Sequence, residues 1–364
     1  MSAWNPVVIT SDEDVEELFV AVARVWWPHA DPRRAARRLR WRWGQTADHL
    51  AYLGQAGGEG MLGGAQLQRR ALRFGPARVE VALLRQLVVD ADHRDQGLEQ
   101  ALCERAAEVA AEAGCPLLLV RLRPGWSAES GFVRIHDPLV VGWPMEQGRA
   151  LPPRPERVRP VGLHDLAEFE ALWTEYFAPH LGASWDDAAD LRGKLNGLLP
   201  LNPPVFALDE AGAVRGCFVP GAGWPRGPQA VVALDAEAIR DLRAFHAHRT
   251  GAWGATEELR WVVPADSPTV AAAQELGATV EREDDPTIGP AARLTDRARL
   301  LADLEPLFTE RAGDLRPDFA QASDADLCQL AFAYRPPADL GLNDPAWAAC
   351  FPPATAWLGD LVGR

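Results

Sequence analysis

The chain repeats one pattern of residues at a constant separation, and this repeat limits the folds that are open to it. A stretch of acidic and apolar residues that begins at Asp14 ends in Pro28-His29, and a similar stretch from Asp165 ends in Pro179-His180. The separation between Asp14 and Asp165 equals that between His29 and His180. Repetition at one offset is typical of two copies of a single structural unit. The sequence therefore predicts two modules of the same kind.

Each copy continues in the same order, with a helical stretch and then two apolar strands joined by a tight turn. The strands are Leu50–Leu53 and Gly63–Leu67 in the first copy, and Val205–Leu208 and Gly216–Val219 in the second. Short apolar runs between turn residues are typical of strands, and their alternation with helices is typical of an α/β protein. We expect two tandem mixed-sheet modules of the α/β (α+β) class.

The composition of the chain also predicts where these modules begin and end. Three prolines close together, Pro152, Pro153 and Pro155, predict a stiff linker, because proline-rich segments are extended. Beyond the second module, apolar residues recur with helical spacing through Leu300–Phe308, which indicates a short, mainly helical end to the chain. The expected parts are a first module at 1–147, a linker at 148–157, a second module at 158–287 and a C-terminal region at 288–364.

The first module contains a turn suited to an anion. The apolar run Leu87–Val89 is followed by Arg94 and Gly97, and an amphipathic helix then begins at Leu98. Backbone N–H groups at a helix start, helped by the positive end of the helix dipole, bind phosphate, and a glycine lets the backbone approach it closely. The second module lacks this turn, because Asp235 and Glu237 stand at the corresponding helix start and would repel a phosphate. We expect the second module to be a structural or substrate-shaping copy.

The pattern V-x-x-x-x-R-x-x-G-[IL] from Val89 to Leu98, with the helix, the strand Leu117–Leu122 and Gly131-Phe132 after it, resembles the GCN5-related N-acetyltransferases. The resemblance implies that the strand ending at Val89 offers its backbone to the pantetheine arm of acetyl-CoA. It also implies that the turn from Arg94 to Gln100 holds the pyrophosphate. The cofactor-binding residues so implied are Leu87, Val88, Val89, Arg94, Asp95, Gln96, Gly97, Leu98, Glu99 and Gln100.

Two such modules followed by a third region resemble the enhanced intracellular survival family along the whole chain. This resemblance implies a sterol-carrier-like C-terminal region, shortened here, and an assembly of several copies of the chain. It also implies acetylation of an amine, either of a small cationic molecule or of a lysine side chain. In the acetyltransferases a tyrosine serves the leaving thiolate and the C-terminal carboxylate takes the amine proton. The matching positions here are Ser127 and Arg364, with Asp360 as a second candidate carboxylate.

Composition excludes several other classes of function. A net charge of −14 argues against a general nucleic-acid binder and favours cationic small molecules as partners. The five cysteines form no C-x-x-C pair, so neither a disulfide framework nor a metal site is expected. No apolar run is long enough for a membrane span and no signal sequence begins the chain, so we expect a cytoplasmic protein without a membrane partner.

The sequence predicts an acetyl-CoA-dependent N-acetyltransferase whose chemistry lies in the first module. The alternative is a non-catalytic protein of the same fold that binds acyl-CoA or another ligand and acts in assembly or regulation. Arg94 and Gly97 favour retained cofactor binding, whereas Ser127 and Glu99 favour lost chemistry. A third hypothesis, that both modules are purely structural, requires the Arg94 turn to be a coincidence.

Overall fold

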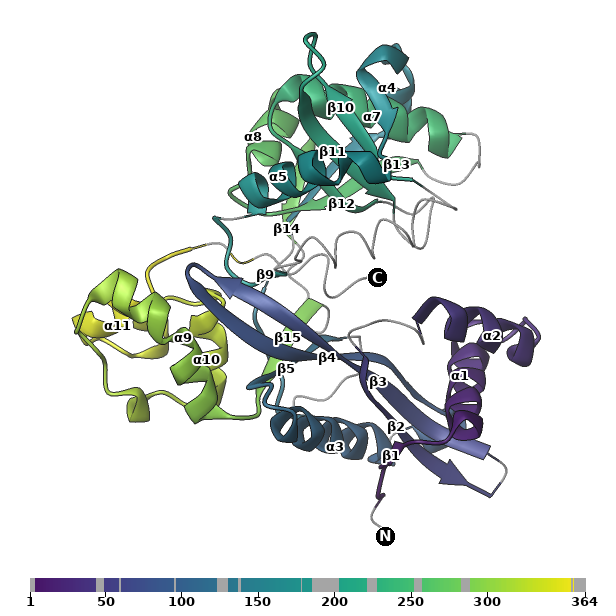
Figure 1. Ribbon diagram of the computed structural model, residues 1–364, viewed down its shortest axis with the longest axis vertical. Helices are drawn as coiled ribbons and strands as arrows, with labels where there is room; N and C mark the ends of the chain where they lie inside the picture. The colour runs from purple at the N-terminus through teal and green to yellow at the C-terminus, as the bar shows by residue number, and fades with distance from the viewer. Residues whose placement is uncertain are drawn as a thin grey trace.

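The computed structural model shows two α/β modules, one above the other, and a group of C-terminal helices beside the first module (Figure 1). The described residues are 4–43, 49–58, 60–94, 96–122, 130–136, 139–177, 179–184, 203–220, 228–251, 257–282, 289–354 and 356. Within this part of the chain, no helix is both long and apolar enough to cross a membrane. The mixed α/β class and the two-module arrangement expected from the sequence are confirmed.

The first module is built on a large mixed sheet. Its strands lie in the order β1 (Val7–Ile9), β2 (His49–Gly57), β3 (Gly60–Phe74), β4 (Ala77–Val89), β5 (Leu117–Leu122), β15 (Gly289–Leu294) and β6 (Val133–Arg134), and β9 (Ala183–Ser184) pairs with β3. All neighbours are antiparallel except β4 and β5, which are parallel. The helix α3 (Leu98–Glu112) connects these two strands and packs on one face of the sheet.

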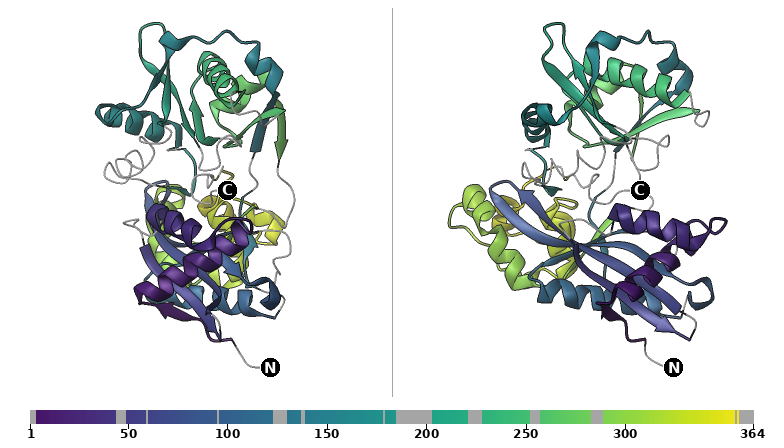
Figure 2. Two further views of the ribbon diagram at one scale, coloured as in Figure 1. Left: turned by 90° about the vertical axis from the view of Figure 1, so that its right-hand side faces the viewer. Right: turned by 45° about the vertical axis from the view of Figure 1, so that its right-hand side comes forward.

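The opposite face of this sheet carries helices at both of its ends. At one end lie α1 (Asp12–Trp26) and α2 (Pro32–Trp43), which Figure 2 shows above the strands. The helix α1 begins where Ser11 accepts a hydrogen bond from the Asp14 amide at 3.0 Å, and an acidic first turn suits its dipole. Its apolar side packs on Tyr52 and Val88 of the sheet. At the other end lie the C-terminal helices.

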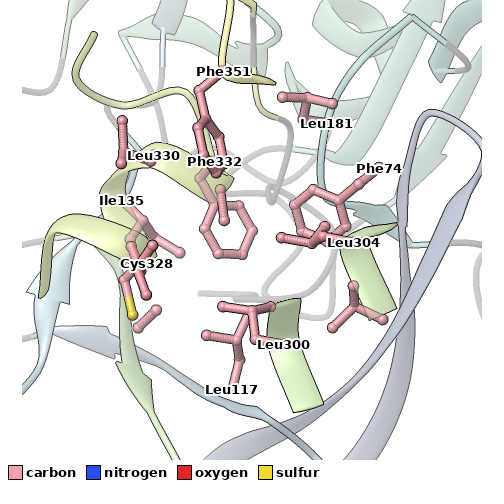
Figure 3. Packing of buried hydrophobic residues seen from close by; sticks show 14 of the residues in the cluster. Phe74, Leu117, Ile135, Leu181, Leu300, Leu304, Cys328, Leu330, Phe332 and Phe351 are labelled. Carbon is pink, nitrogen blue, oxygen red and sulfur yellow. The ribbon is translucent and has the colours of Figure 1, made fainter. Parts of the chain in front are cut away.

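These helices are α9 (Arg297–Ala312), α10 (Asp324–Ala331) and α11 (Pro345–Cys350), with short 3-10 turns at Phe319–Gln321 and Pro337–Leu340. Their apolar side chains share one core with β3, β4 and β5, in which the rings of Phe332 and Phe74 lie 5.3 Å apart (Figure 3). The described residues after β15 form no strand of their own, although Ala356 makes an isolated bridge to Leu181. The region therefore covers the first sheet, and its resemblance to a sterol carrier stays a prediction.

The second module has two small sheets. One contains β12 (Pro228–Ala233), β11 (Val214–Pro220), β10 (Val205–Leu208) and β8 (Val158–Pro160), and the other contains β13 (Glu258–Val263), β7 (Leu139–Pro144) and β14 (Thr279–Arg282). Its helices are α4 (Met145–Arg149), α5 (Leu166–Phe177), α7 (Ala236–Gly251) and α8 (Pro268–Glu275). After β12 the module continues along the chain with α7, β13, α8 and β14.

The two modules exchange one strand each. β7 follows β6 of the first module along the chain, yet it pairs on both sides with β13 and β14 of the second. In return, β15 follows the second module but lies between β5 and β6 of the first. This pairing differs from the expected division, which kept 139–144 in the first module and 289–294 in the C-terminal region. Both strands are short and mostly apolar. Their sequence pattern alone therefore does not show to which of the two sheets each strand belongs.

The linker at 148–157 is held against the second module by ion pairs. Arg154 Nη1 lies 2.7 Å from Glu237 Oε2, and Arg157 Nε lies 3.4 Å from Asp241 Oδ2. The Asp241 side chain is almost fully buried, and this desolvation raises the pKa of its carboxyl although both arginines lower it. The linker therefore continues into the second module as a fixed segment.

We expect a fragment of residues 1–147 not to fold by itself, because it lacks β15 and the helices that cover the sheet. The loss of β15 leaves β5 and β6 without their shared partner and exposes buried apolar residues of β4 and β5. Circular dichroism during urea titration should show no cooperative transition for this fragment. Joining 1–136 to 289–364 by a Gly/Ser linker restores both elements and should restore cooperative unfolding. A cooperative transition in the 1–147 fragment would contradict the role assigned to the exchange.

Candidate functional site

The candidate site begins where the parallel strands β4 and β5 part. Their pairing extends only from Val81 opposite Leu117 to Leu83 opposite Leu119. β4 then continues to Val89 and β5 to Leu122 without further pairing between them. The sheet therefore opens between two adjacent strands, directly before the helix α3.

A β-bulge lies in β4 just beyond this point. Gln66 of β3 pairs with Arg85, but the next pair joins Gly64 to Val88, so β4 carries one residue more than its partner. Gln86 within the bulge has a φ of 47°, in the left-handed region that side chains rarely adopt. Leu84 and Leu87 both pack in the core beneath α3, so the bulge places Arg85 and Gln86 together on the other face.

The start of α3 is open to an anion. Gly97 is its N-cap, with a φ of 83°, and as a glycine it provides no capping side chain for the amides of the first turn. A Cβ at Gly97 would meet no atom of the described residues within 4 Å, so the helix start is not covered by this part of the chain. The helix dipole adds positive potential there. The start of α3 therefore fits the pyrophosphate that the family resemblance implies for this turn.

The N-terminal segment supports this turn from the side. The indole Nε1 of Trp4 donates a hydrogen bond of 2.7 Å to the carbonyl of Gln96, and the Trp4 and His93 rings meet edge to face at 5.9 Å. Gln96 Nε2 in turn donates to the carbonyl of Asp92 at 2.8 Å. These contacts tie Gln96 to Trp4 and to Asp92 at the side of the helix start. The sequence carries no local signal for the contact of Trp4, because it lies far from the turn along the chain.

The predicted cofactor residues occupy three environments. Leu87, Val89 and Leu98 are buried under α3, and Val88 is buried on the face of α1. Arg94, Gln96, Gly97 and Gln100 are exposed around the turn, and Glu99 is half-buried in the first turn of the helix. Asp95 and the three predicted catalytic residues, Ser127, Asp360 and Arg364, lie outside the described residues. Their roles stay predictions.

The corresponding helix start in the second module is already occupied by the protein itself. Asp235 Oδ1 accepts a hydrogen bond from the Ala238 amide at 2.8 Å, and Oδ2 accepts one from Arg215 Nε at 2.9 Å. The strands β12 and β13 belong to separate sheets. Near them the Tyr176 hydroxyl donates to Thr269 Oγ1 at 2.6 Å, which donates to the carbonyl of Ala233 at 3.1 Å. The Asp235 carboxylate thus takes the place that a phosphate would need at this helix start.

Cysteine chemistry is not favoured at either module. All five cysteines are buried. Burial raises the pKa of the Cys103 thiol and of the Cys328 thiol to about 12, so both stay protonated near neutral pH. Among the described residues, no group of histidine, cysteine or acidic side chains could hold a metal ion.

The sequence of the first module matches a known protein family. Residues 13–124 match the model of the acetyltransferase (GNAT) family. A search of curated proteins finds no match to the chain.

Several solved structures resemble most or nearly all of the chain at low sequence identity. A GCN5-related N-acetyltransferase from Anabaena variabilis is 13% identical, with 97% of this chain and 98% of that chain covered and a TM-score of 0.62. Eis1 from Mycobacterium abscessus is 16% identical, with 98% and 99% covered and a TM-score of 0.56. A tandem GNAT protein from the clavulanic acid biosynthesis pathway is 16% identical, with 80% and 98% covered and a TM-score of 0.52. The chain therefore has a GNAT fold in a two-module arrangement, and residues 13–124 match the sequence model of the GNAT family.

Proposed function

We propose that the protein is an N-acetyltransferase that takes the acetyl group from acetyl-CoA and acts through its first module. One observation carries the proposal: β4 and β5 part after Leu83 and Leu119, directly before the uncapped start of α3 at Gly97. An opening between strands admits an extended arm, and free amides at a helix start bind its pyrophosphate. The match of 13–124 to the acetyltransferase model supports the same assignment.

Each part of the site has a role in this proposal. The amides of Leu98, Glu99 and Gln100, with the Arg94 side chain, hold the pyrophosphate. The backbone of Leu87–Val89 binds the pantetheine arm and donates to the thioester carbonyl. Acetyl-CoA supplies the activated acyl group. Ser127 is the proposed group that serves the leaving thiolate. The Asp360 side chain or the C-terminal carboxylate of Arg364 is proposed to take the amine proton.

The proposed acceptor is an amine of a small cationic molecule or of a lysine side chain. The net charge of −14 produces a negative potential that concentrates cations near the protein. The amine has to lose its proton before it attacks the thioester, since only the neutral nitrogen has a free electron pair.

Calorimetric titration with acetyl-CoA should show one site per chain, because Asp235 caps the second module's helix start while Gly97 leaves the first one open. A thiol-release assay on the same preparation, with a panel of primary amines, then tests the transfer. Two sites per chain would contradict the assignment of the second module. Binding without thiol release would favour a non-catalytic acyl-CoA-binding protein, and the lack of binding would overturn the proposal.

A further inference from the structure

Gln86 has three properties that rarely occur together. Its backbone φ is 47°, the residue is only 7% exposed, and its amide oxygen Oε1 accepts no hydrogen bond from any described residue. Buried polar groups are nearly always hydrogen-bonded, and strained backbone persists mainly where function requires it. Gln86 is therefore a strained residue that presents an unused hydrogen-bond acceptor.

A second unused polar group lies on the same face of the sheet. Tyr52 of β2 pairs with Gln66 of β3, and Gln66 pairs with Arg85 beside Gln86, so these residues form one row across three strands. Tyr52 is 7% exposed, and no described residue hydrogen-bonds to its hydroxyl. Burial raises the pKa of this hydroxyl, although Arg40 lowers it, so Tyr52 stays a neutral donor.

The row lies between the two sets of helices that cover this face. Tyr52 and Val88 belong to the core under α1 and α2, whereas Leu83 belongs to the core under the C-terminal helices. Gln86 comes three residues after Leu83, the last residue of β4 that pairs with β5. It therefore stands next to the opening that the proposed function assigns to the acyl donor.

We propose that Gln86 and Tyr52 form the binding site for the acceptor, an inference that rests on the proposed function. Gln86 Oε1 accepts a hydrogen bond from the amine of the acceptor, and the Tyr52 hydroxyl binds a carbonyl or hydroxyl group of the same molecule. The ligand class is a small primary amine that carries such a polar group. In the transfer, the amine nitrogen forms a bond to the acyl carbon, and the carbon–sulfur bond breaks. The proton that the amine loses balances the proton that the thiolate gains.

The neutral amide at this position suits the chemistry. A carboxylate beside the amine would stabilise the ammonium form and raise the pKa of the amine. The amine would then lose its proton only at higher pH. A glutamine oxygen orients the N–H group without that effect. Gln86 itself does not titrate, so it positions the amine and takes no proton.

Two substitutions of Gln86 test this role. Gln86→Met keeps the size but removes the hydrogen bond, and it should raise the KM for the acceptor about tenfold while the Kd for acetyl-CoA stays unchanged. Gln86→Glu should move the rising limb of the pH profile of kcat/KM to higher pH. The probe amines are ethanolamine and glycinamide, with spermidine as the amine that lacks a carbonyl or hydroxyl group. Gln329→Met makes the same chemical change in α10, which packs on β15 and β6 outside the row of Tyr52 and Gln86, and should leave both constants unchanged.

A third variant keeps the test valid if Gln86→Met fails to fold. Gln86→Gly removes the side chain and also relieves the positive φ, so it should be at least as stable as the wild type and should show the same rise in KM. An unchanged acceptor KM, an unchanged pH profile in Gln86→Glu or a preference for spermidine overturns the acceptor site alone. A wild-type protein that binds no acetyl-CoA overturns the proposed function, and the acceptor site with it.

Discussion

Replacing Gly97 by aspartate is expected to abolish acetyl-CoA binding and to leave the fold intact. The new carboxylate would accept hydrogen bonds from the first-turn amides of α3, as Asp235 does in the second module. It would also repel the pyrophosphate. Charge-assisted hydrogen bonds contribute about 1.5–3 kcal/mol each, so losing two of them lowers the affinity by roughly 100-fold or more. Calorimetric titration with acetyl-CoA measures this loss.

The stability of the Gly97→Asp variant should change little. A capping carboxylate stabilises a helix by about 1 kcal/mol, which offsets a similar cost of placing a side chain at a φ of 83°. Gly114→Asp is the matched control, because Gly114 follows the same helix, has a φ of 72° and also faces open space. This control should bind acetyl-CoA normally. Equal affinity in both variants would show that the start of α3 is not the phosphate site.

The contrast between the two helix starts explains how one fold can be used twice with different results. Both modules carry a helix that begins after a strand, but one start is a glycine and the other is a capping aspartate. Capping stabilises the second helix and at the same time fills its anion site. The first module keeps an open helix start, which is less stable by itself but available to a ligand. The second module can then contribute packing, including the partner strands of β7.

The local elements of this chain could be predicted from the sequence because their signals are local. The helix α3 follows from its apolar spacing and from Gly114, which closes it in the left-handed region. The helix α9 follows from the spacing of its leucines. The start of α3 at Gly97 follows from a local signal as well, whereas the anion-binding role of the turn stays a prediction.

Features that depend on distant contacts could not be predicted in this way. The exchange of β7 and β15 leaves the pattern of each strand unchanged, so only the three-dimensional pairing reveals it. The bulge had one sequence signal, because Arg85 and Gln86 are adjacent polar residues within an apolar strand and break its alternation. A break of alternation does not show which side chain lacks a partner, so the role proposed for Gln86 required the surrounding structure.

Replacing Phe332 by alanine is expected to destabilise the first module, although Phe332 lies in the C-terminal region. Its ring is almost fully buried and packs 5.3 Å from Phe74 of β3, within the core that Figure 3 shows. Removing a buried phenylalanine side chain costs about 3–5 kcal/mol, which includes the cavity it leaves. The midpoint of urea unfolding should fall accordingly.

The same variant decides whether the C-terminal helices are a domain of their own. Their core includes residues of β3, β4 and β5, so the helices and the first sheet should unfold together. Acetyl-CoA binding and circular dichroism, followed through one urea titration, should therefore lose their signals at the same shifted midpoint. Leu315→Ala removes a side chain that is 50% exposed and should change the stability by less than about 0.5 kcal/mol. If helix content were lost at a lower urea concentration than acetyl-CoA binding, the C-terminal helices would unfold independently of the first module. The first sheet would then hold its cofactor turn without these helices.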